Sequence, residues 1–214
     1  MSEPKALTAR LLARLAEISA LEPTVDVAKR DSYVEANGWH VDAREIALPS
    51  EAPGAPEPEG AFAVASRVLL EYGFTPQRLI RGTFDPQAPL ALRPMLLTAT
   101  YLWMTFELAV RVTRVIDERR VGAHGEEQVW GYSYQTLAGH LERGEITFEL
   151  TKHIASGQVV FRIHSYSQTG HVPNLLHRIG FRLVGRRLQK RFAEESLQNM
   201  RRLVLQTTHG RVAP

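Results

Sequence analysis

Residues 145–167 read EITFELTKHIASGQVVFRIHSYS, and apolar side chains alternate with polar ones along this stretch. The alternating apolar residues, three on each side of Gly157, are Ile146, Phe148, Leu150, Val159, Phe161 and Ile163. A period of two residues is typical of a β-strand with one buried face, and a glycine between two such runs is typical of a tight turn. The stretch therefore predicts two antiparallel strands, 145–154 and 158–167, that share one apolar face.

Further strands extend this pattern towards the N-terminus. They are predicted at 39–45, 78–84, 96–108, 110–118 and 128–137. Glycines lie in several of the short connections between them, so the strands after residue 76 are expected to form an antiparallel meander. The uncharged run 95–106 belongs to this sheet, because a helix that spans a bilayer takes roughly 20 apolar residues.

Three segments have the apolar spacing of amphipathic helices. They are 7–18, 62–72 and 173–205. Gly73 is expected to end the second helix, and Gly180 and Gly185 mark places where the third could bend or break. The segment 49–60 contains four prolines and three glutamates. It offers almost no side chains for a core and predicts a mobile loop.

The order of these elements predicts an α+β fold. A curved antiparallel sheet must bury its apolar face, and the long C-terminal helix can lie across that face and be gripped by it. We expect an N-terminal helical extension over residues 1–30 and one domain over residues 31–214, which includes the loop 49–60. A single helix does not fill the centre of a strongly curved sheet, so a cavity between sheet and helix is the expected site.

A specific motif lies within residues 131–167. An aromatic-rich strand ends in the sequence YQTL at 134–137, a Gly-His pair follows at 139–140, Gly-Glu at 144–145 precedes Phe148, and an apolar strand ends at Ser167. This pattern resembles a family of bacterial and plant proteins that is catalogued only as a domain of unknown function (number nineteen-ninety).

Two residues of the last helix, Gln189 and Phe192, also resemble positions of that family, whereas Gln135, Leu141 and Ile146 depart from its usual glycine, proline and acidic residue. The first 30 residues lie outside the resemblance. The family in turn resembles the helix-grip superfamily of START-domain, pollen-allergen and polyketide-cyclase proteins. This implies the same gripped helix that the element order predicts, but the family has no assigned reaction.

Aromatic residues are concentrated on the predicted strands. Our leading hypothesis is that they line the cavity and bind a small hydrophobic ligand, with two polar residues beside them. The candidate ligand-binding residues are Trp103, Trp130, Tyr132, Tyr134, Thr136, Phe148, Phe161 and Gln189. The alternative is that the aromatic rings form an ordinary core and that the Thr136 hydroxyl bonds to nearby backbone.

A second hypothesis is an enzyme of the cyclase or hydratase type. His140 and Glu145, or Arg162 and His164, would transfer protons at the mouth of the cavity. This requires the side chains to converge within about 3 to 4 Å of one site. In the alternative, His140 and Glu145 bond to the backbone of their turn, while Arg162, His164 and Tyr166 face solvent.

Composition excludes several other chemistries. The chain has no cysteine, which removes disulfides, thiolate nucleophiles and cysteine-based zinc sites. No helical His-x-x-x-His pair with a third ligand occurs, so no metal site is predicted. Glycine-rich nucleotide loops and a Gly-x-Ser-x-Gly elbow are also missing, and no cofactor is predicted. The start of the chain has no secretion signal, so a cytoplasmic location is expected.

The charge is unevenly distributed. Residues 173–214 hold nine Lys and Arg against two Glu, a balance of +7, while the preceding residues hold seventeen against twenty-one, a balance of −4. Arg178, Arg182, Arg186 and Lys190 form a basic stripe on the last helix. A third hypothesis is an interaction module that uses this stripe to hold anionic lipid or nucleic acid. The stripe also complements a mildly acidic body, which makes nucleic acid the less favoured of these two partners. The sequence does not set the oligomeric state.

Overall fold

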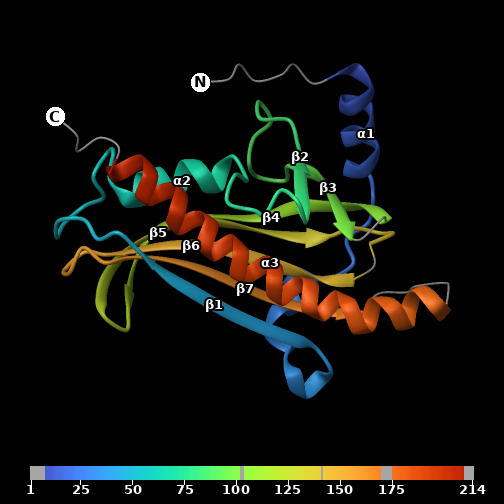
Figure 1. The fold of residues 1–214 in the computed structure, drawn as a ribbon. Helices are drawn as coiled ribbons and strands as arrows, with labels where there is room; N and C mark the ends of the chain where they lie inside the picture. The colour runs from blue at the N-terminus through green and yellow to red at the C-terminus, as the bar shows by residue number, and fades with distance from the viewer. Residues whose placement is uncertain (1–7, 102–103, 141, 170–174, 210–214) are drawn as a thin grey trace.

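The computed structural model describes residues 8–101, 104–140, 142–169 and 175–209, with side chains described except at 101, 104, 175–186 and 209. This part of the chain folds into seven strands, three α-helices and two short 3-10 helices (Figure 1). In chain order they are α1 (Ala9–Ser19), η1 (Val27–Ser32), η2 (Glu35–Asn37), β1 (His40–Leu48), α2 (Ala61–Leu70), β2 (Ile80–Thr83), β3 (Pro94–Tyr101), β4 (Met104–Gly122), β5 (Gly125–Thr136), β6 (Glu142–His153), β7 (Val159–Thr169) and α3 (Leu175–His209).

All seven strands belong to one antiparallel sheet with the order β1-β7-β6-β5-β4-β3-β2. Strands β2 to β7 follow one another as a meander, and β1 joins the open edge of β7. The sequence predicted this meander and its antiparallel pairing, and both predictions are confirmed. We call the face of the sheet that carries Phe148 and Phe161 the inner face, and the opposite face the outer face.

The junction between β3 and β4 was predicted wrongly. We expected one strand over 96–108 and another over 110–118, whereas β4 runs unbroken from residue 104 to residue 122. The cause is that both faces of β3 are apolar. Met95 and Leu97 lie in the main core, and Leu96 packs on the other side against α1. Without alternation, the sequence gives no signal for where this strand ends.

Two helices cover the inner face. Helix α2 contacts β5 and β6, and α3 contacts β1, β7 and α2. Figure 1 shows α3 lying across the sheet as the closing element. The helix is continuous past residues 180 and 185, so the glycines there do not break it. The predicted architecture, a curved antiparallel sheet that grips a long C-terminal helix, is confirmed. Among the described helices none is long and apolar enough to cross a membrane.

The N-terminal segment lies on the outer face. Helix α1 packs against β3 and β4, as an amphipathic helix with Leu15 and Ile18 buried. The chain then passes along the end of β5, where Pro23 bridges to Leu137. Beyond it, Tyr33 stacks near Trp39 and Tyr166 in a small aromatic cluster. The N-terminal segment therefore covers part of the outer face, whereas α2 and α3 cover the inner face.

The loop 49–60 has no regular structure, as predicted, but it is not free of the core. Glu51 is buried and accepts hydrogen bonds from Lys152 on β6, at 2.6 Å, and from the backbone N–H of Phe62 in the first turn of α2, also at 2.6 Å. Gly60 precedes α2 as a cap without a side chain, and a Cβ there would lie 2.4 Å from the Glu51 carboxylate. One carboxylate of this loop therefore serves as a remote cap of α2, a contact that the composition of residues 49–60 did not predict.

Candidate functional site

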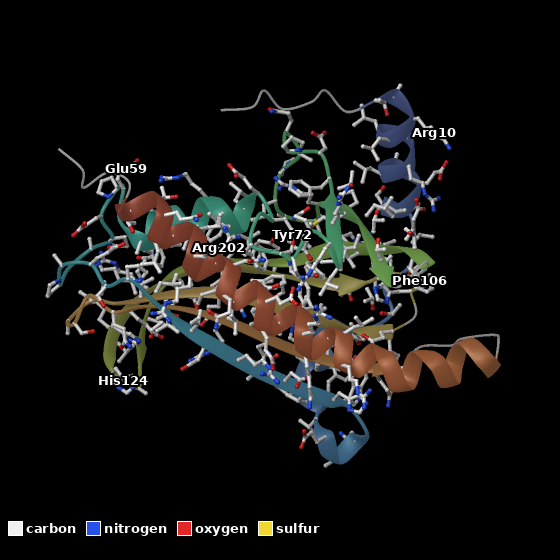
Figure 2. All side chains as sticks on the ribbon, viewed as in Figure 1. Arg10, Glu59, Tyr72, Phe106, His124 and Arg202 are labelled. Carbon is white, nitrogen blue, oxygen red and sulfur yellow. The ribbon has the colours of Figure 1, made fainter. Side chains whose placement is uncertain are left out.

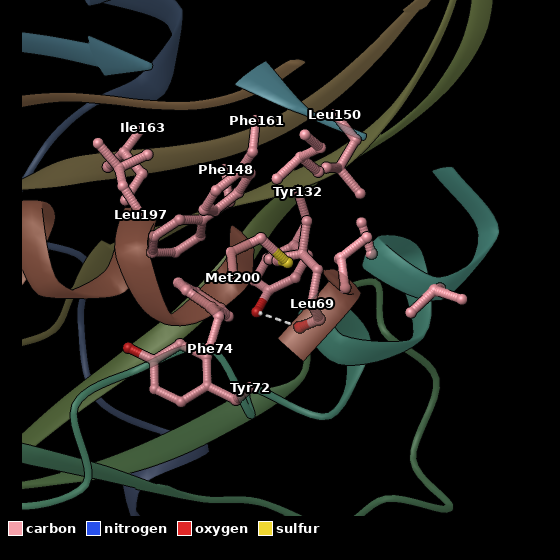
Figure 3. Packing of buried hydrophobic residues seen from close by; sticks show 14 of the residues in the cluster. Leu69, Tyr72, Phe74, Tyr132, Phe148, Leu150, Phe161, Ile163, Leu197 and Met200 are labelled. Carbon is pink, nitrogen blue, oxygen red and sulfur yellow. Dashed lines mark hydrogen bonds between the residues drawn. The ribbon is translucent and has the colours of Figure 1, made fainter. Parts of the chain in front are cut away.

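The inner face is built from rows of side chains that lie side by side on neighbouring strands. One row, which we call the central row, consists of Tyr132, Phe148 and Ile163. All three are buried, and they pack with Leu197 and Met200 of α3 in one cluster (Figure 3). The central row and α3 therefore form a solid core in the middle of the grip.

The next row towards the end of the sheet is different. It consists of Tyr134, Ile146 and Ser165, and we call it the end row. Tyr134 is buried, but Ile146 and Ser165 are partly exposed. Two more apolar side chains at the edge of the core, Leu108 on β4 and Phe192 on α3, are also only partly buried. The close packing of the central row is therefore not continued at the end row.

A third tyrosine connects the end row to α2. Tyr72 follows α2 and has the left-handed backbone angle φ 58°, which is uncommon for a large side chain. Its hydroxyl lies 2.9 Å from that of Tyr134, whereas the Tyr132 hydroxyl donates to the Leu69 carbonyl at 3.2 Å. Figure 2 places Tyr72 in the middle of the molecule and Phe106, near the start of β4, at one side.

The predicted ligand-binding residues separate into two groups. Tyr132, Phe148 and Phe161 are buried members of the core, and Trp130 packs against the same core while remaining partly exposed. These rings follow the core alternative that the sequence left open. Tyr134 belongs to the same buried cluster, but its partner on β6 is the partly exposed Ile146. Trp103 lies outside the described residues, as do the side chains of Arg178, Arg182 and Arg186.

The two predicted polar contacts, Thr136 and Gln189, have protein partners. The Thr136 hydroxyl accepts the N–H of Gly144 at 3.0 Å and also bonds to the Thr24 hydroxyl, so it joins three segments of backbone. The Gln189 side chain donates to Glu142 and lies 3.4 Å from the Ser167 hydroxyl. Gln189 therefore fastens α3 to the ends of β6 and β7, next to the end row.

Glu145, one of the proton-transfer candidates, is buried on the outer face. A bulge in β4 between Val112 and Arg114 turns Thr113 towards it. The carboxylate accepts hydrogen bonds of 2.5 to 2.6 Å from Thr113, Arg30 and Tyr166. Burial raises the pKa of Glu145, but the bonds from Arg30, Thr113 and Tyr166 outweigh it, so the pKa lies below its ordinary value. A carboxylate held in this way is a structural anion and a poor base.

The other three candidates do not join Glu145 in one site. His140 accepts the backbone N–H of Glu142 on Nδ1 at 3.0 Å, and burial lowers its pKa to about 4. Arg162 is exposed and pairs with Glu45 at 2.7 Å, and His164 is exposed two residues further along the same face of β7. Arg162 and His164 thus face outwards, away from the core residues Phe161 and Ile163. The geometry does not supply the convergence that proton transfer requires.

A groove of about 580 Å³ lies outside the grip, between the segment after α2 and the exposed side of α3. Pro76, Gln77 and Arg78 form one wall, and Glu194, Glu195, Gln198 and Asn199 form the other. Arg78 crosses it to Glu195 at 2.5 Å. Sequence reasoning missed this groove, because its two walls are far apart in the chain and have no motif in common.

Sequence reasoning also missed Tyr72, Ile146 and Ser165 as members of the candidate site. Ile146 was recognised as an inner-face residue, but alternation alone does not show where packing stops. Tyr72 carried one signal, its position immediately before Gly73 at the end of a predicted helix. The turn there uses Tyr72 itself as the left-handed residue, whereas Gly73 was the expected helix stop.

Comparison with known protein families decides the membership of the chain. The family described as Domain of unknown function (DUF1990) matches residues 24–199. The chain belongs to this family. The match begins at residue 24, so it includes residues 24–30, which the sequence resemblance left outside. No sequence among the curated proteins matches this chain.

Two solved structures show that this family member has the helix-grip fold. A norcoclaurine synthase of Thalictrum flavum, a point mutant in complex with a transition-state analogue, is 11% identical, with a TM-score of 0.50 over 79% of this chain and 96% of that chain. The Zhui aromatase/cyclase from Streptomyces sp. R1128 is also 11% identical, with a TM-score of 0.50 over 82% of this chain and all of that one. The fold is thus similar to that of a ligand-bound enzyme and a cyclase, at identities that speak for the fold alone.

Proposed function

We propose that this DUF1990 protein binds a small, largely apolar molecule between the sheet and α3, at the end row. The observation that carries the proposal is the contrast between two adjacent rows. The central row is fully buried against α3, whereas Ile146 and Ser165 of the end row are partly exposed on the same face. Apolar side chains left partly exposed inside a fold are typical of a binding surface.

The surroundings of the end row fit a mainly apolar ligand with a few polar contacts. Leu108, Ile146 and Phe192 offer apolar area at the edge of the core. Tyr134, Ser165 and Gln189 offer hydroxyl and amide groups. A ligand that buries about 200 Å² of apolar area gains on the order of 5 kcal/mol before the costs of association. Affinity for a simple aromatic probe is therefore expected in the micromolar range or weaker.

The similarity of fold supports binding of a small molecule in general, without indicating which molecule. The norcoclaurine synthase structure holds a transition-state analogue, so a helix-grip scaffold of this size accommodates a small molecule. The proposal assigns no proton-transfer role to His140, Glu145, Arg162 or His164, because their hydrogen bonds and their faces separate them.

The test combines native mass spectrometry with a blocking variant. Protein purified without detergent is analysed for a retained small molecule, and binding of ethylnaphthalene is measured by displacement or calorimetry. Ser165→Phe places a large ring in the end row and should abolish binding. Val121→Phe is the matched control, because Val121 is 84% exposed at the far end of β4.

Unfolding by urea must give similar stability for both variants, which separates blocking from misfolding. Binding by the wild type and by Val121→Phe but not by Ser165→Phe would support the proposal. A wild-type protein that carries no molecule and binds no apolar probe, or binding that Ser165→Phe leaves unchanged, would overturn it.

A further inference from the structure

Among the described residues, the tyrosine pair at the end row has one hydroxyl hydrogen more than it has acceptors. A tyrosine hydroxyl donates one hydrogen bond and also accepts. Tyr72 and Tyr134 face each other at 2.9 Å, and this is the one hydrogen bond of either hydroxyl among the described residues. A single bond between two hydroxyls consumes one hydrogen and leaves the other without an acceptor.

Both hydrogens are present at neutral pH. Burial raises the pKa of Tyr72 well above its ordinary value, with further contributions from the neighbouring tyrosines. Burial likewise raises the pKa of Tyr134, although the hydrogen bond with Tyr72 lowers it in part. A buried hydroxyl hydrogen without an acceptor costs free energy, so the fold keeps a donor here that its own described residues do not satisfy.

The positions of the two rings show which of the two hydroxyls belongs to the end row. Tyr72 is 2% exposed and Tyr134 is 6% exposed. Tyr134 lies directly opposite the partly exposed Ile146, whereas Tyr72 is enclosed by Phe74 and Phe148. Either hydroxyl can donate in the shared bond. Because Tyr134 borders the end row, an acceptor oxygen there would take the Tyr134 hydrogen and leave Tyr72 to donate to Tyr134.

The pair is held in place by unusual backbone geometry. Tyr72 keeps a left-handed conformation, which is unfavourable for a large side chain and persists only where its surroundings hold it. Gly82 on β2 makes room for the ring, since a Cβ there would lie 2.6 Å from the Tyr72 Cδ1 atom. Two separate features of the fold thus maintain the Tyr72 ring in the position that presents its hydroxyl to Tyr134.

We infer that the Tyr134 hydroxyl, oriented by Tyr72, donates a hydrogen bond to an oxygen atom of the bound molecule, and that the ligand class is an apolar compound with a carbonyl, carboxylate or similar acceptor oxygen. This inference rests on the proposed function and makes it more specific. Tyr134 is the ligand contact, and Tyr72 is a positioning residue that supplies the proton of the shared bond.

The test compares two probes of nearly equal size and shape, acetylnaphthalene and ethylnaphthalene substituted at the same ring position. Only the first has an acceptor oxygen. The wild type should bind the ketone about three- to tenfold more tightly than the hydrocarbon, the ratio that one net hydrogen bond provides. In Tyr134→Phe this preference should disappear, while affinity for the hydrocarbon stays within about twofold.

Two further variants make the test specific. Tyr72→Phe leaves the Tyr134 donor in place but removes the group that orients it, so the preference for the ketone should fall below the wild-type ratio without disappearing. Tyr132→Phe is the matched control, because the Tyr132 hydroxyl is already bonded to the Leu69 carbonyl, and it should retain the full ratio. Urea unfolding of each variant confirms that it is folded under the binding conditions.

The possible outcomes separate the two levels of argument. If neither probe binds the wild type, the proposed function fails and the inference with it. If both probes bind with equal affinity, or if Tyr134→Phe keeps the preference for the ketone, the proposed function stands and the inference is overturned.

Discussion

The buried pair of Lys152 and Glu51 offers the sharpest test of how the grip is held together. Lys152 is on β6 and points to the inner face, where its ammonium group donates to Glu51 at 2.6 Å and to the Ala55 carbonyl at 3.0 Å. The exposed fractions of the two side chains are 0% and 2%. Lys152→Met keeps the length of the side chain and removes the cation, which leaves the Glu51 carboxylate buried without its counter-ion.

Loss of one partner of a buried ion pair costs about 3 to 5 kcal/mol. In a chain of this size, 1 kcal/mol corresponds to a change of about 2 to 4 °C in Tm. Lys152→Met should therefore lower Tm by about 6 to 20 °C and lower the urea midpoint at an unchanged m-value. Circular dichroism during thermal and urea unfolding measures both quantities.

Two controls isolate the ion pair. Arg162→Met removes one partner of the exposed pair Arg162–Glu45, whose side chains are 48% and 56% exposed, and should cost less than about 1 kcal/mol. The double variant Glu51→Leu/Lys152→Met should regain part of the loss, because an apolar pair replaces the uncompensated charge. If Lys152→Met were no more destabilising than Arg162→Met, the loop would not be anchored by this pair.

Three further perturbations probe separate parts of the structure. Gly82→Ala should destabilise the protein by about 1 to 3 kcal/mol in urea unfolding, because the new Cβ would lie 2.6 Å from the Tyr72 ring. Gly73→Ala is the control and should be tolerated in the same assay, because its nearest contact would be at 3.7 Å. The pKa of His140 in the folded protein is about 4, below the ordinary 6.5. Its neutral form therefore contributes stability above pH 6.5, and this contribution is lost as the pH falls towards 4. His140→Asn should reduce the slope of stability against pH in this range by up to about 1.4 kcal/mol per pH unit. Glu145 also has a lowered pKa, so its contribution to stability is present above its ordinary pKa of 4.5 and is lost below it. Glu145→Gln should lower the urea midpoint at pH 7 and flatten the decline of that midpoint below pH 4.5. An unchanged decline would contradict the lowered pKa.

Most of the fold could be predicted from the sequence, because the inner and outer faces of β6 and β7 differ in polarity. Alternation in residues 145–167 marks the buried face, and the order of elements leaves α3 to cover it. The same logic fails at β3, where α1 covers the outer face and Leu96 is as apolar as its inner-face neighbours. It also misses the bulge at Thr113, which shifts which residues of β4 point inwards. Where another element packs on the outer face of a strand, both faces are apolar and the alternation on which the prediction depends is lost.

The anchored loop was missed for a related reason. Composition describes the average behaviour of residues 49–60, but one glutamate with one buried lysine decides the outcome. A signal was available, because Lys152 continues the inner-face series after Phe148 and Leu150. A charge at such a position must find a partner. The partner itself could not be read from the chain, since Glu51 lies 101 residues away.

The candidate site shows the same limit at a finer scale. Sequence reasoning selected aromatic residues of the inner face, but it treated Tyr132 and Tyr134 as equivalent because they share one strand face. In the structure the two tyrosines lie in different rows, and their hydroxyls have different hydrogen-bond partners. Tyr132 has the Leu69 carbonyl, and Tyr134 has another hydroxyl. Only packing and hydrogen-bond accounting distinguish a hydroxyl bonded to a backbone carbonyl from one bonded to another hydroxyl.

Stability and the proposed binding are therefore placed on different rows of the same sheet. The central row, α3 and the anchored loop supply close packing, and the N-terminal segment covers the outer face with its own aromatic cluster. The end row adds Tyr134 to the same core, while its Ile146 and Ser165 stay partly exposed. Tyr72 links the two regions, because its backbone belongs to the end of α2 while its hydroxyl meets Tyr134. Since α2 is capped by Glu51, and Glu51 is held by Lys152, the position of the tyrosine pair depends on an ion pair at the opposite end of that helix.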